Sequence, residues 1–312
     1  MSTGVASGRR AVFPLVPRRR LVGAPFGNER SRRRGHGTDV AGRRDYVRGD
    51  AVASIDWHAS ARLASARGSD EFVVRTYFAH EAPRVTLVCD HRPSMSLYAP
   101  PLPWLSKPAA LGVATRAIAA SAAAARAEFA YLDFADSAPY WLHPTARSAG
   151  RLLVSGRIDD AAFAAPPDLV ERAFDFLARR ARDVPAGAFV FVLSDFLEPS
   201  AVRALERALS EQWDVVPVVI QDPVWEQTFP DVAGAAVSVC DPETGRAVPV
   251  RFRRRDVRER RAANEERLRD LLARCARLGL DPVVLGTSDR RDVLQAFLGW
   301  AERRGRARVA RR

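Results

Sequence analysis

Residues that form disulfides, hold soft metals or carry amine chemistry are scarce in this sequence. Its 312 residues include 3 cysteines and 5 histidines, and Lys107 is the only lysine. No CxxC, HxxxH or HExxH spacing occurs, which excludes a disulfide framework and the usual zinc sites. No GxxxxGK[ST], GxGxxG or GxSxG motif occurs, so nothing indicates nucleotide binding or a nucleophile elbow. We therefore expect a protein that is not an enzyme, with no cofactor and no evident small-molecule substrate.

Long apolar runs are also missing. No uncharged apolar run reaches the ~18–20 residues needed to cross a bilayer, and the nearest candidate, residues 109–125, is mostly alanine and contains Arg116. Residues 1–20 lack the apolar core of a secretory signal. With three isolated cysteines, this predicts a cytoplasmic protein without a transmembrane segment. Cys89 and Cys240 fall in apolar, strand-like runs, where buried and inert thiols are expected.

Positive charge is abundant but unevenly placed. The sequence holds 49 Lys and Arg against 37 Asp and Glu, a net charge of +12. Residues 1–50 contribute +8 and residues 301–312 contribute +5, so residues 51–300 have a balance of −1. A nucleic-acid-binding domain would concentrate its basic residues on a folded face, so a nucleic-acid partner is not expected. The Arg-rich ends are interpreted as solvated arms, and binding to an anionic surface through them is the alternative.

The middle of the chain alternates short apolar runs with amphipathic or alanine-rich segments. Strands are predicted at 84–90, 128–134, 188–195, 214–220 and 282–285, and helices at 108–126, 168–182, 199–210, 256–278 and 289–303. This alternation predicts a three-layer α/β fold, in which helices cover both faces of a mostly parallel sheet. Residues 138–142 are expected to add a hairpin strand to it.

Composition divides the chain into four parts. Residues 1–35 are predicted to form a basic, largely irregular arm with a short strand at 11–16, and residues 304–312 a basic tail. Residues 36–83 are predicted to form a β-rich N-terminal segment with a strand at 71–78. Residues 84–303 form the α/β domain, with an inserted hairpin at 235–250.

Three segments resemble one family. They are YVRGD at 46–50 with IDWHASAR at 55–62, DHRPSM at 90–95, and LSDF at 193–196 with WDV at 213–215, DP at 222–223 and DPETG at 241–245. In order and spacing they resemble the bacterial domain of unknown function 58 family, over about residues 15–300. The resemblance implies a von Willebrand factor A-like domain. It also implies pairing with a MoxR-type AAA+ ATPase.

Domains of this kind often hold a divalent ion through an Asp-x-Ser-x-Ser motif, a Thr and a late Asp. Asp90 and Ser94 match the motif and Asp195 the late Asp, whereas Arg92 and Pro167 stand where hydroxyl ligands are expected. A hard cation needs about six oxygens, but a guanidinium can itself bridge two carboxylates. We therefore hypothesise that Arg92 lies between Asp90 and Asp195 in place of the ion. The alternatives are that Arg92 points to solvent, or that Mg²⁺ binds to Asp90, Ser94 and Asp195.

The family signature is carried by residues of the N-terminal segment, namely Tyr46, Gly49, Asp50, Asp56, Trp57 and Arg62. One interpretation is structural: an Asp–Arg pair, and a Trp that docks this segment onto the sheet. The other is that these residues contact a partner directly.

These observations predict a protein-interaction module that binds its partner at the rim of the sheet, through Asp90, His91, Arg92, Ser94 and Asp195. By resemblance, the partner is a MoxR-type AAA+ ATPase, and the pair acts in assembling or maturing other proteins. Arg92 is expected to select acidic partner groups directly. Two rival functions stay open: an anionic-surface binder that uses the Arg-rich termini, and a metal-dependent hydrolase that uses the rim acids.

Overall fold

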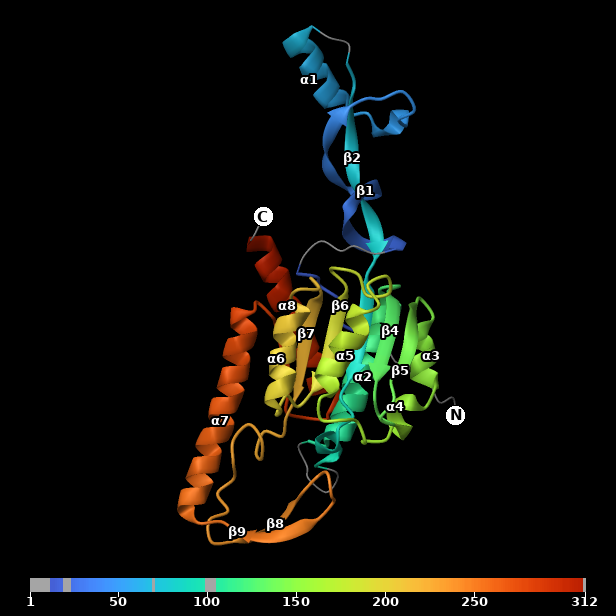
Figure 1. The fold of residues 1–312 in the computed structure, drawn as a ribbon. Coiled ribbons are helices and arrows are strands. Elements are labelled where there is room, and N and C mark those ends of the chain that lie inside the picture. The colour runs from blue at the N-terminus through green and yellow to red at the C-terminus, as the bar shows by residue number, and fades with distance from the viewer. Residues whose placement is uncertain (1–11, 19–23, 69–70, 99–104, 311–312) are drawn as a thin grey trace, which may run out of the picture.

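A computed structural model describes residues 12–18, 24–68, 71–98 and 105–310. Parts of the two basic ends, residues 1–11, 19–23 and 311–312, lie outside the described residues. The centre is a six-stranded sheet with the order β10-β7-β6-β3-β4-β5 (Figure 1). Its strands are β3 (Arg84–Cys89), β4 (Glu128–Asp133), β5 (Tyr140–Thr145), β6 (Phe189–Ser194), β7 (Asp214–Ile220) and β10 (Val283–Leu285).

The sheet is parallel except at one edge, where β5 pairs antiparallel with β4. Every residue of β6 and β7 is buried, as their continuous apolar sequences predict for central strands. The chain first adds strands on one side of β3 and then returns to add β6 on the other side. In a doubly wound sheet of this kind, ligands bind beyond the carboxyl ends of the strands at this point of reversal, here between β3 and β6.

Helices cover both faces of the sheet, which confirms the three-layer α/β prediction. One apolar core lies under α2 (Lys107–Ala124), α3 (Ser148–Val154) and α8 (Arg290–Ala310). The other lies under α5 (Leu169–Ala178), α6 (Pro199–Ala208) and α7 (Arg254–Arg277). Successive residues of β3 alternate between the two cores, with Leu87 in the first and Val88 in the second, as the two-residue period of a strand requires. None of the helices in the described part of the chain is both long and apolar enough to span a bilayer.

Residues 12–18 belong to the core and not to a solvated arm. Phe13 and Leu15 are 3% and 5% exposed. The Phe13 ring stacks on the ring of Phe297 in α8, with 4.5 Å between ring centres. The Phe13 backbone nitrogen donates to Ser121 Oγ of α2. Over residues 12–16, the described part of the strand predicted at 11–16, no strand forms, because this segment packs its side chains between two helices. The predicted irregular arm is therefore too long, and the first strand begins well before residue 36.

That first strand, β1 (Ala24–Asp45), pairs antiparallel with β2 (Val73–Ala82), and the pair extends away from the six-stranded sheet (Figure 1). Between them lie the short 3₁₀ helix η1 (Val52–Ser54) and α1 (Trp57–Arg67), a helix that was not predicted. Asp56 caps the start of α1 by accepting from the Ala59 backbone nitrogen, and Gly68 ends it at a φ of 64°. We call residues 24–82 the arm.

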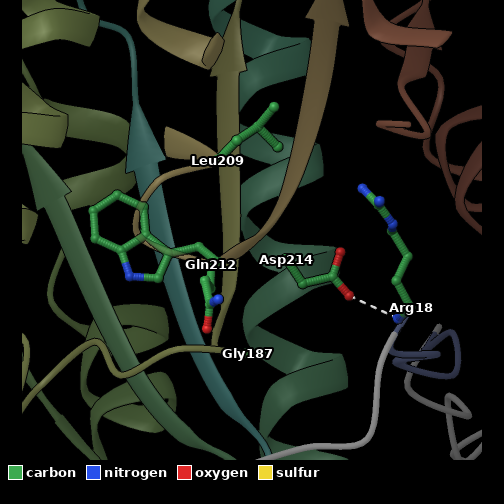
Figure 2. A pocket seen from close by; sticks show the side chains of 6 residues that line it. Arg18, Gly187, Leu209, Gln212 and Asp214 are labelled. Carbon is green, nitrogen blue, oxygen red and sulfur yellow. Dashed lines mark hydrogen bonds between the residues drawn. The ribbon is translucent and has the colours of Figure 1, made fainter. Parts of the chain in front are cut away.

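The C-terminal end is also more ordered than predicted. Helix α8 runs to Ala310, and Arg304 is only 4% exposed. Its guanidinium binds both carboxylate oxygens of Asp214 and one of Asp281. Asp214 also accepts from the backbone nitrogen of Arg18 at 2.8 Å, beside a small cavity (Figure 2). The predicted tail from residue 304 is wrong because the buried face of α8 continues to Arg304, whose charge Asp214 compensates.

The inserted hairpin is present as β8 (Ala236–Cys240) and β9 (Ala247–Arg251), at the end of the molecule opposite the arm (Figure 1). Cys240 is exposed, which contradicts its predicted burial, while Cys89 and Cys275 are buried. The reason is that β8 and β9 form a separate two-stranded sheet. Of its residues, Val237 and Val250 pack against a small apolar cluster, and Cys240 does not belong to that cluster.

Candidate functional site: a buried charge cluster at the sheet rim

The two rim acids lie side by side because their strands are neighbours. Asp90 follows β3 and Asp195 follows β6, and the Asp90 backbone nitrogen donates to the Leu193 carbonyl at 2.9 Å. Both aspartates are 0% exposed. Two buried carboxylates this close require compensating charge, because an unpaired charge in a dry interior is strongly unfavourable.

Arg92 supplies part of that charge. Its Nη2 lies 2.6 Å from Asp90 Oδ2 and 2.9 Å from Asp195 Oδ1, and its Nε also contacts both Asp90 oxygens. The Arg92 side chain is 5% exposed, so the alternative in which it points to solvent is wrong. Burial opposes the charged form, but the pKa of Arg92 is raised because the two aspartates outweigh it. The hypothesis that Arg92 bridges Asp90 and Asp195 is confirmed.

The other two predicted rim residues take different parts. Ser94 donates from its hydroxyl to Asp195 Oδ2 at 2.8 Å. His91 is 2% exposed and turned toward the ring of Phe163, with 5.2 Å between ring centres. Its Nδ1 is buried with no hydrogen-bond partner, and burial lowers the pKa of His91, so the ring is neutral at pH 7. His91 is therefore a neutral neighbour of the cluster and does not bind the rim acids.

Lys107 completes the cluster, although no motif near it predicts this position. Its ammonium lies 3.0 Å from Asp195 Oδ2, 2.5 Å from Glu226 Oε1 and 3.2 Å from the Ser94 carbonyl. These three acceptors match the three donors of an ammonium group. The side chain is 0% exposed; burial opposes its charge, but Asp195 and Glu226 raise the pKa of Lys107 above its ordinary value.

Glu226 reaches the cluster from the loop after β7. Its Oε2 accepts from the Asp222 backbone nitrogen at 2.8 Å, which orients Oε1 toward Lys107. Burial raises the pKa of Glu226, and Lys107 offsets only part of that effect. The pKa of Asp195 moves the other way: burial would raise it, but Lys107 and Arg92 together lower it. We call Asp90, Arg92, Lys107, Asp195 and Glu226 the charge cluster.

Two of the loops around the charge cluster are strained. Phe196, directly after Asp195, has a φ of 51°, and Tyr98 has a φ of 60°. Left-handed backbone costs a non-glycine residue roughly 1 kcal/mol or more. Three hydrogen bonds hold the Phe196 turn: Phe196 N donates to Ser194 Oγ, Leu197 N donates to Asp195 Oδ1, and Gln221 Nε2 donates to the Asp195 carbonyl.

The residues of the rim do not fit a divalent metal ion. All four carboxylate oxygens of Asp90 and Asp195 already accept hydrogen bonds, mainly from Arg92, Lys107 and neighbouring hydroxyls. A hard cation needs about six oxygens at 2.0–2.6 Å, and here two side-chain cations occupy that space. Within the described residues, no group of three or more His, Cys, Asp and Glu side chains is arranged to hold a metal.

The structure does not bring the signature residues to the rim. They lie in the arm, at the opposite end of the sheet (Figure 1). Asp50 binds Arg44 through both oxygens in a turn that passes through Gly49 at a φ of 109°, and Asp56 binds Arg43 at 2.8 Å. Asp–Arg pairs are therefore present, but they join these aspartates to Arg43 and Arg44 and not to Arg62 of the signature.

The structural interpretation is also wrong for Trp57. Trp57 is 57% exposed and does not dock the arm onto the sheet, because its ring contacts Phe72 within the arm. Tyr46 contacts the same ring, and Arg62 Nε donates to the His58 carbonyl one turn before it.

The fold and the rim define a three-layer α/β protein with a closed charge cluster at the point where strand order reverses. The chain belongs to the family described as "Protein of unknown function DUF58", whose model matches residues 42–270. Among solved structures, the chain is similar to an aerotolerance-related membrane protein from Bacteroides fragilis. The two share 14% identity at a TM-score of 0.38, over 71% of this chain and 100% of that one. No curated protein matches the sequence.

Proposed function

We propose that this chain is a non-enzymatic protein-interaction module with a von Willebrand factor A-like domain. In the proposal, its rim is a degenerate metal-ion-dependent adhesion site in which Arg92 and Lys107 take the place of the ion. The observation that supports it most is the bridge from Asp90 through Arg92 to Asp195, with Lys107 on the second Asp195 oxygen. Acids that are fully paired and buried are poor general acids or bases, which favours binding over hydrolysis.

The role of Arg92 in this proposal differs from the sequence-based expectation. We expected it to select acidic partner groups directly, but it is 4% exposed and bonded to Asp90 and Asp195. In the proposal, the charge cluster instead fixes the loops above it, where Leu97 and Leu197 are half-buried and Glu198 is exposed. The strained turn at Phe196 is consistent with a loop held in one conformation for binding.

We propose that the partner is a MoxR-type AAA+ ATPase, as the resemblance implies, and that the pair assembles or matures other proteins. The test is co-purification of the tagged full chain from its own host, with and without ATP. We expect to recover an AAA+ ATPase in an amount that depends on ATP. Recovery of no ATPase under either condition would contradict the proposal.

The metal-free rim is tested separately by thermal unfolding in Mg²⁺ and Mn²⁺. A ligand that binds the folded state stabilises it by about 2.7 kcal/mol at a hundred times its Kd. We expect no saturable rise in Tm with either ion. A rise that saturates at millimolar metal and disappears in Asp90→Ala would show that the rim binds an ion and that the side-chain cations do not replace it.

A further inference from the structure

The start of helix α7 carries a dense group of arginines that the proposed function does not use. Residues 251–261 hold seven arginines and two acids, and six of these arginines are exposed. We call these six the basic patch: Arg251, Arg253, Arg254, Arg255, Arg258 and Arg260. They lie beside the hairpin of β8 and β9, at the end of the molecule opposite the arm (Figure 1).

The charge of the basic patch is not cancelled by its neighbours in the chain. Residues 229–250 before it bring one arginine and three acids, and residues 262–277 after it bring four arginines and three acids. Residues 229–277 together therefore hold twelve arginines and eight acids, a balance of +4. Within the described residues, the pair Arg255–Glu259 is the only ion pair that involves the basic patch. The surface therefore complements a partner of negative charge.

These arginines do not stabilise the helix that carries them. The N-terminus of a helix has a partial positive charge, so acidic side chains stabilise its first turn and basic side chains destabilise it. Arg253 is the N-cap of α7, Arg254 and Arg255 follow it, and Asp256 is the acid of the first turn. Residues that a local rule of folding disfavours are typical of functional surfaces.

The start of α7 is held in place by a small apolar cluster. Phe229, Phe252 and Val257 are buried together there. The Arg260 guanidinium lies 5.5 Å from the centre of the Phe252 ring, and Arg261 Nε donates to the Phe229 carbonyl at 2.9 Å. The helix start is therefore fixed to the loop that follows β7, so little order has to be created when a partner binds.

The surroundings of the basic patch favour an acidic protein over a nucleic acid. Single strands of nucleic acid stack their bases on exposed aromatic rings, whereas both rings of residues 229–277, Phe229 and Phe252, are buried. An apolar pair lies on the hairpin instead: Val239 and Val248 face each other across its strands and are 41% and 46% exposed. Guanidinium groups bind carboxylates through two parallel hydrogen bonds.

We propose that the basic patch and this valine pair are a docking surface for a segment of a partner protein that is rich in Asp and Glu and has apolar residues between them. The loop after β7 leads from the rim to this surface, so both lie at the same end of the sheet (Figure 1). That one partner contacts both rests on the proposed function above.

The proposal is tested with the purified full chain and a fluorescent peptide of Glu-Glu-Leu repeats, whose binding is followed by anisotropy. The patch variant is Arg254→Glu/Arg258→Glu. Its matched control is Arg290→Glu/Arg291→Glu, which makes the same change in charge at exposed arginines of the start of α8. We expect the patch variant to weaken binding by about tenfold or more, because like charges then face each other.

The control should weaken binding by less than about twofold, because charges far from the peptide are screened. Both variants keep the Arg-rich ends, so the difference between them reports on the basic patch. Since glutamate stabilises the first turn of a helix, both should fold, and far-UV circular dichroism checks this. Equal losses in the two variants would show that the peptide responds only to net charge and would overturn the proposal.

The valine pair is tested with a peptide of Glu-Glu-Ser repeats, which has the same charge without the apolar residues. We expect the wild type to bind it more weakly than the Glu-Glu-Leu peptide. Equal affinity for the two peptides would remove the valine pair from the docking surface.

Two other occupants are tested with duplex DNA and with vesicles that contain phosphatidylglycerol. We expect the patch variant and its control to bind each of them alike. A loss that is confined to the patch variant, and is larger than its loss for the Glu-Glu-Leu peptide, would replace the acidic protein by a nucleic acid or a membrane.

The outcomes also separate this proposal from the proposed function. If the ATPase co-purifies with the tagged chain but the two variants lose the peptide equally, the docking surface is wrong and the proposed function stands. If no ATPase co-purifies but only the patch variant loses the peptide, the proposed function fails and the docking surface stands. Equal recovery of the ATPase from the patch variant and its control would show that the ATPase does not use this surface.

Discussion

Replacing the single lysine gives the sharpest test of the buried charge cluster. Lys107→Met keeps the unbranched apolar stem and removes the ammonium. The variant leaves Asp195 and Glu226 buried with Arg92 as the remaining cation of the cluster. Removing one partner of a buried ion pair costs about 3–5 kcal/mol, because the charge left behind has lost both its water and its partner. The upper part of that range applies here, since Lys107 serves two carboxylates.

That loss is large enough to measure by urea unfolding. With a urea m-value of about 3 kcal/mol per M, the midpoint falls by roughly 1–1.7 M. Folding can be followed by far-UV circular dichroism. Adding Glu226→Gln to Lys107→Met removes one of the two carboxylates that lost their cation. We therefore expect the free energy of unfolding of the double variant to be about 1–3 kcal/mol higher than the two single changes would give if they simply added.

The effect also depends on pH with a defined sign. In the wild type, Lys107 holds the pKa of Asp195 down. Without the ammonium, the folded-state pKa values of Asp195 and Glu226 rise above their unfolded values, so the folded state binds more protons than the unfolded state. Stability is then greatest below the unfolded pKa and is lost as the pH rises through the folded pKa. The variant should therefore be closer to the wild type at about pH 5 than at about pH 8.

The matched control is Arg116→Met on the same helix. Arg116 pairs with Asp159, but the two side chains are 42% and 67% exposed. Exposed pairs contribute about 0–1 kcal/mol, so this variant should change the free energy of unfolding by less than about 1 kcal/mol at every pH. If Lys107→Met costs no more than Arg116→Met, or if its cost does not change with pH, the charge cluster does not have the energetic role we assign to it.

Three further predictions follow from other parts of the chain. Phe13→Ala should lower the free energy of unfolding, measured with urea, by about 3–5 kcal/mol, because Phe13 is buried against Phe297. A change below about 1 kcal/mol would show that residues 12–18 do not contribute to the core. Hydrogen bonds from Arg43 lower the pKa of Asp56 to about 2. The arm should therefore loosen as the pH falls from about 4 to about 2, and Asp56→Asn should abolish that step in the NMR amide signal of Trp57. Finally, a thiol reagent should label one cysteine of the native protein, Cys240, because burial raises the pKa of Cys89 to about 12 and of Cys275 to about 11.

Much of the α/β body could be predicted from local pattern. The run from Phe189 to Ser194 is continuously apolar and becomes a fully buried strand. The helix predicted at 199–210 forms over Pro199–Ala208, with proline at its first turn. The rim acids were placed correctly for the same reason, since Asp90 and Asp195 each follow a strand that the sequence shows plainly.

The arm was predicted less well. Helix α1 was missed because its sequence, WHASARLASAR, has only two large apolar residues, Trp57 and Leu63, and no clear apolar stripe. Its start depends on a single cap, Asp56, whose carboxylate is held by Arg43 and Arg75 of the two strands of the arm. A helix that depends on contacts from outside itself gives little signal in its own periodicity.

The sequence by itself determined the order of the main strands and helices of the α/β body and the identity of four charge-cluster or rim residues: Asp90, Arg92, Ser94 and Asp195. Only the tertiary structure decided that Lys107 and Glu226 join them. They come from the start of α2 and from the loop after β7, and no fixed spacing links them to the rim acids. The one hint was compositional, because a chain that otherwise uses arginine keeps a lysine at this position. Periodicity reports which face of an element is buried, whereas the pairing of buried charges depends on where separate loops meet in space.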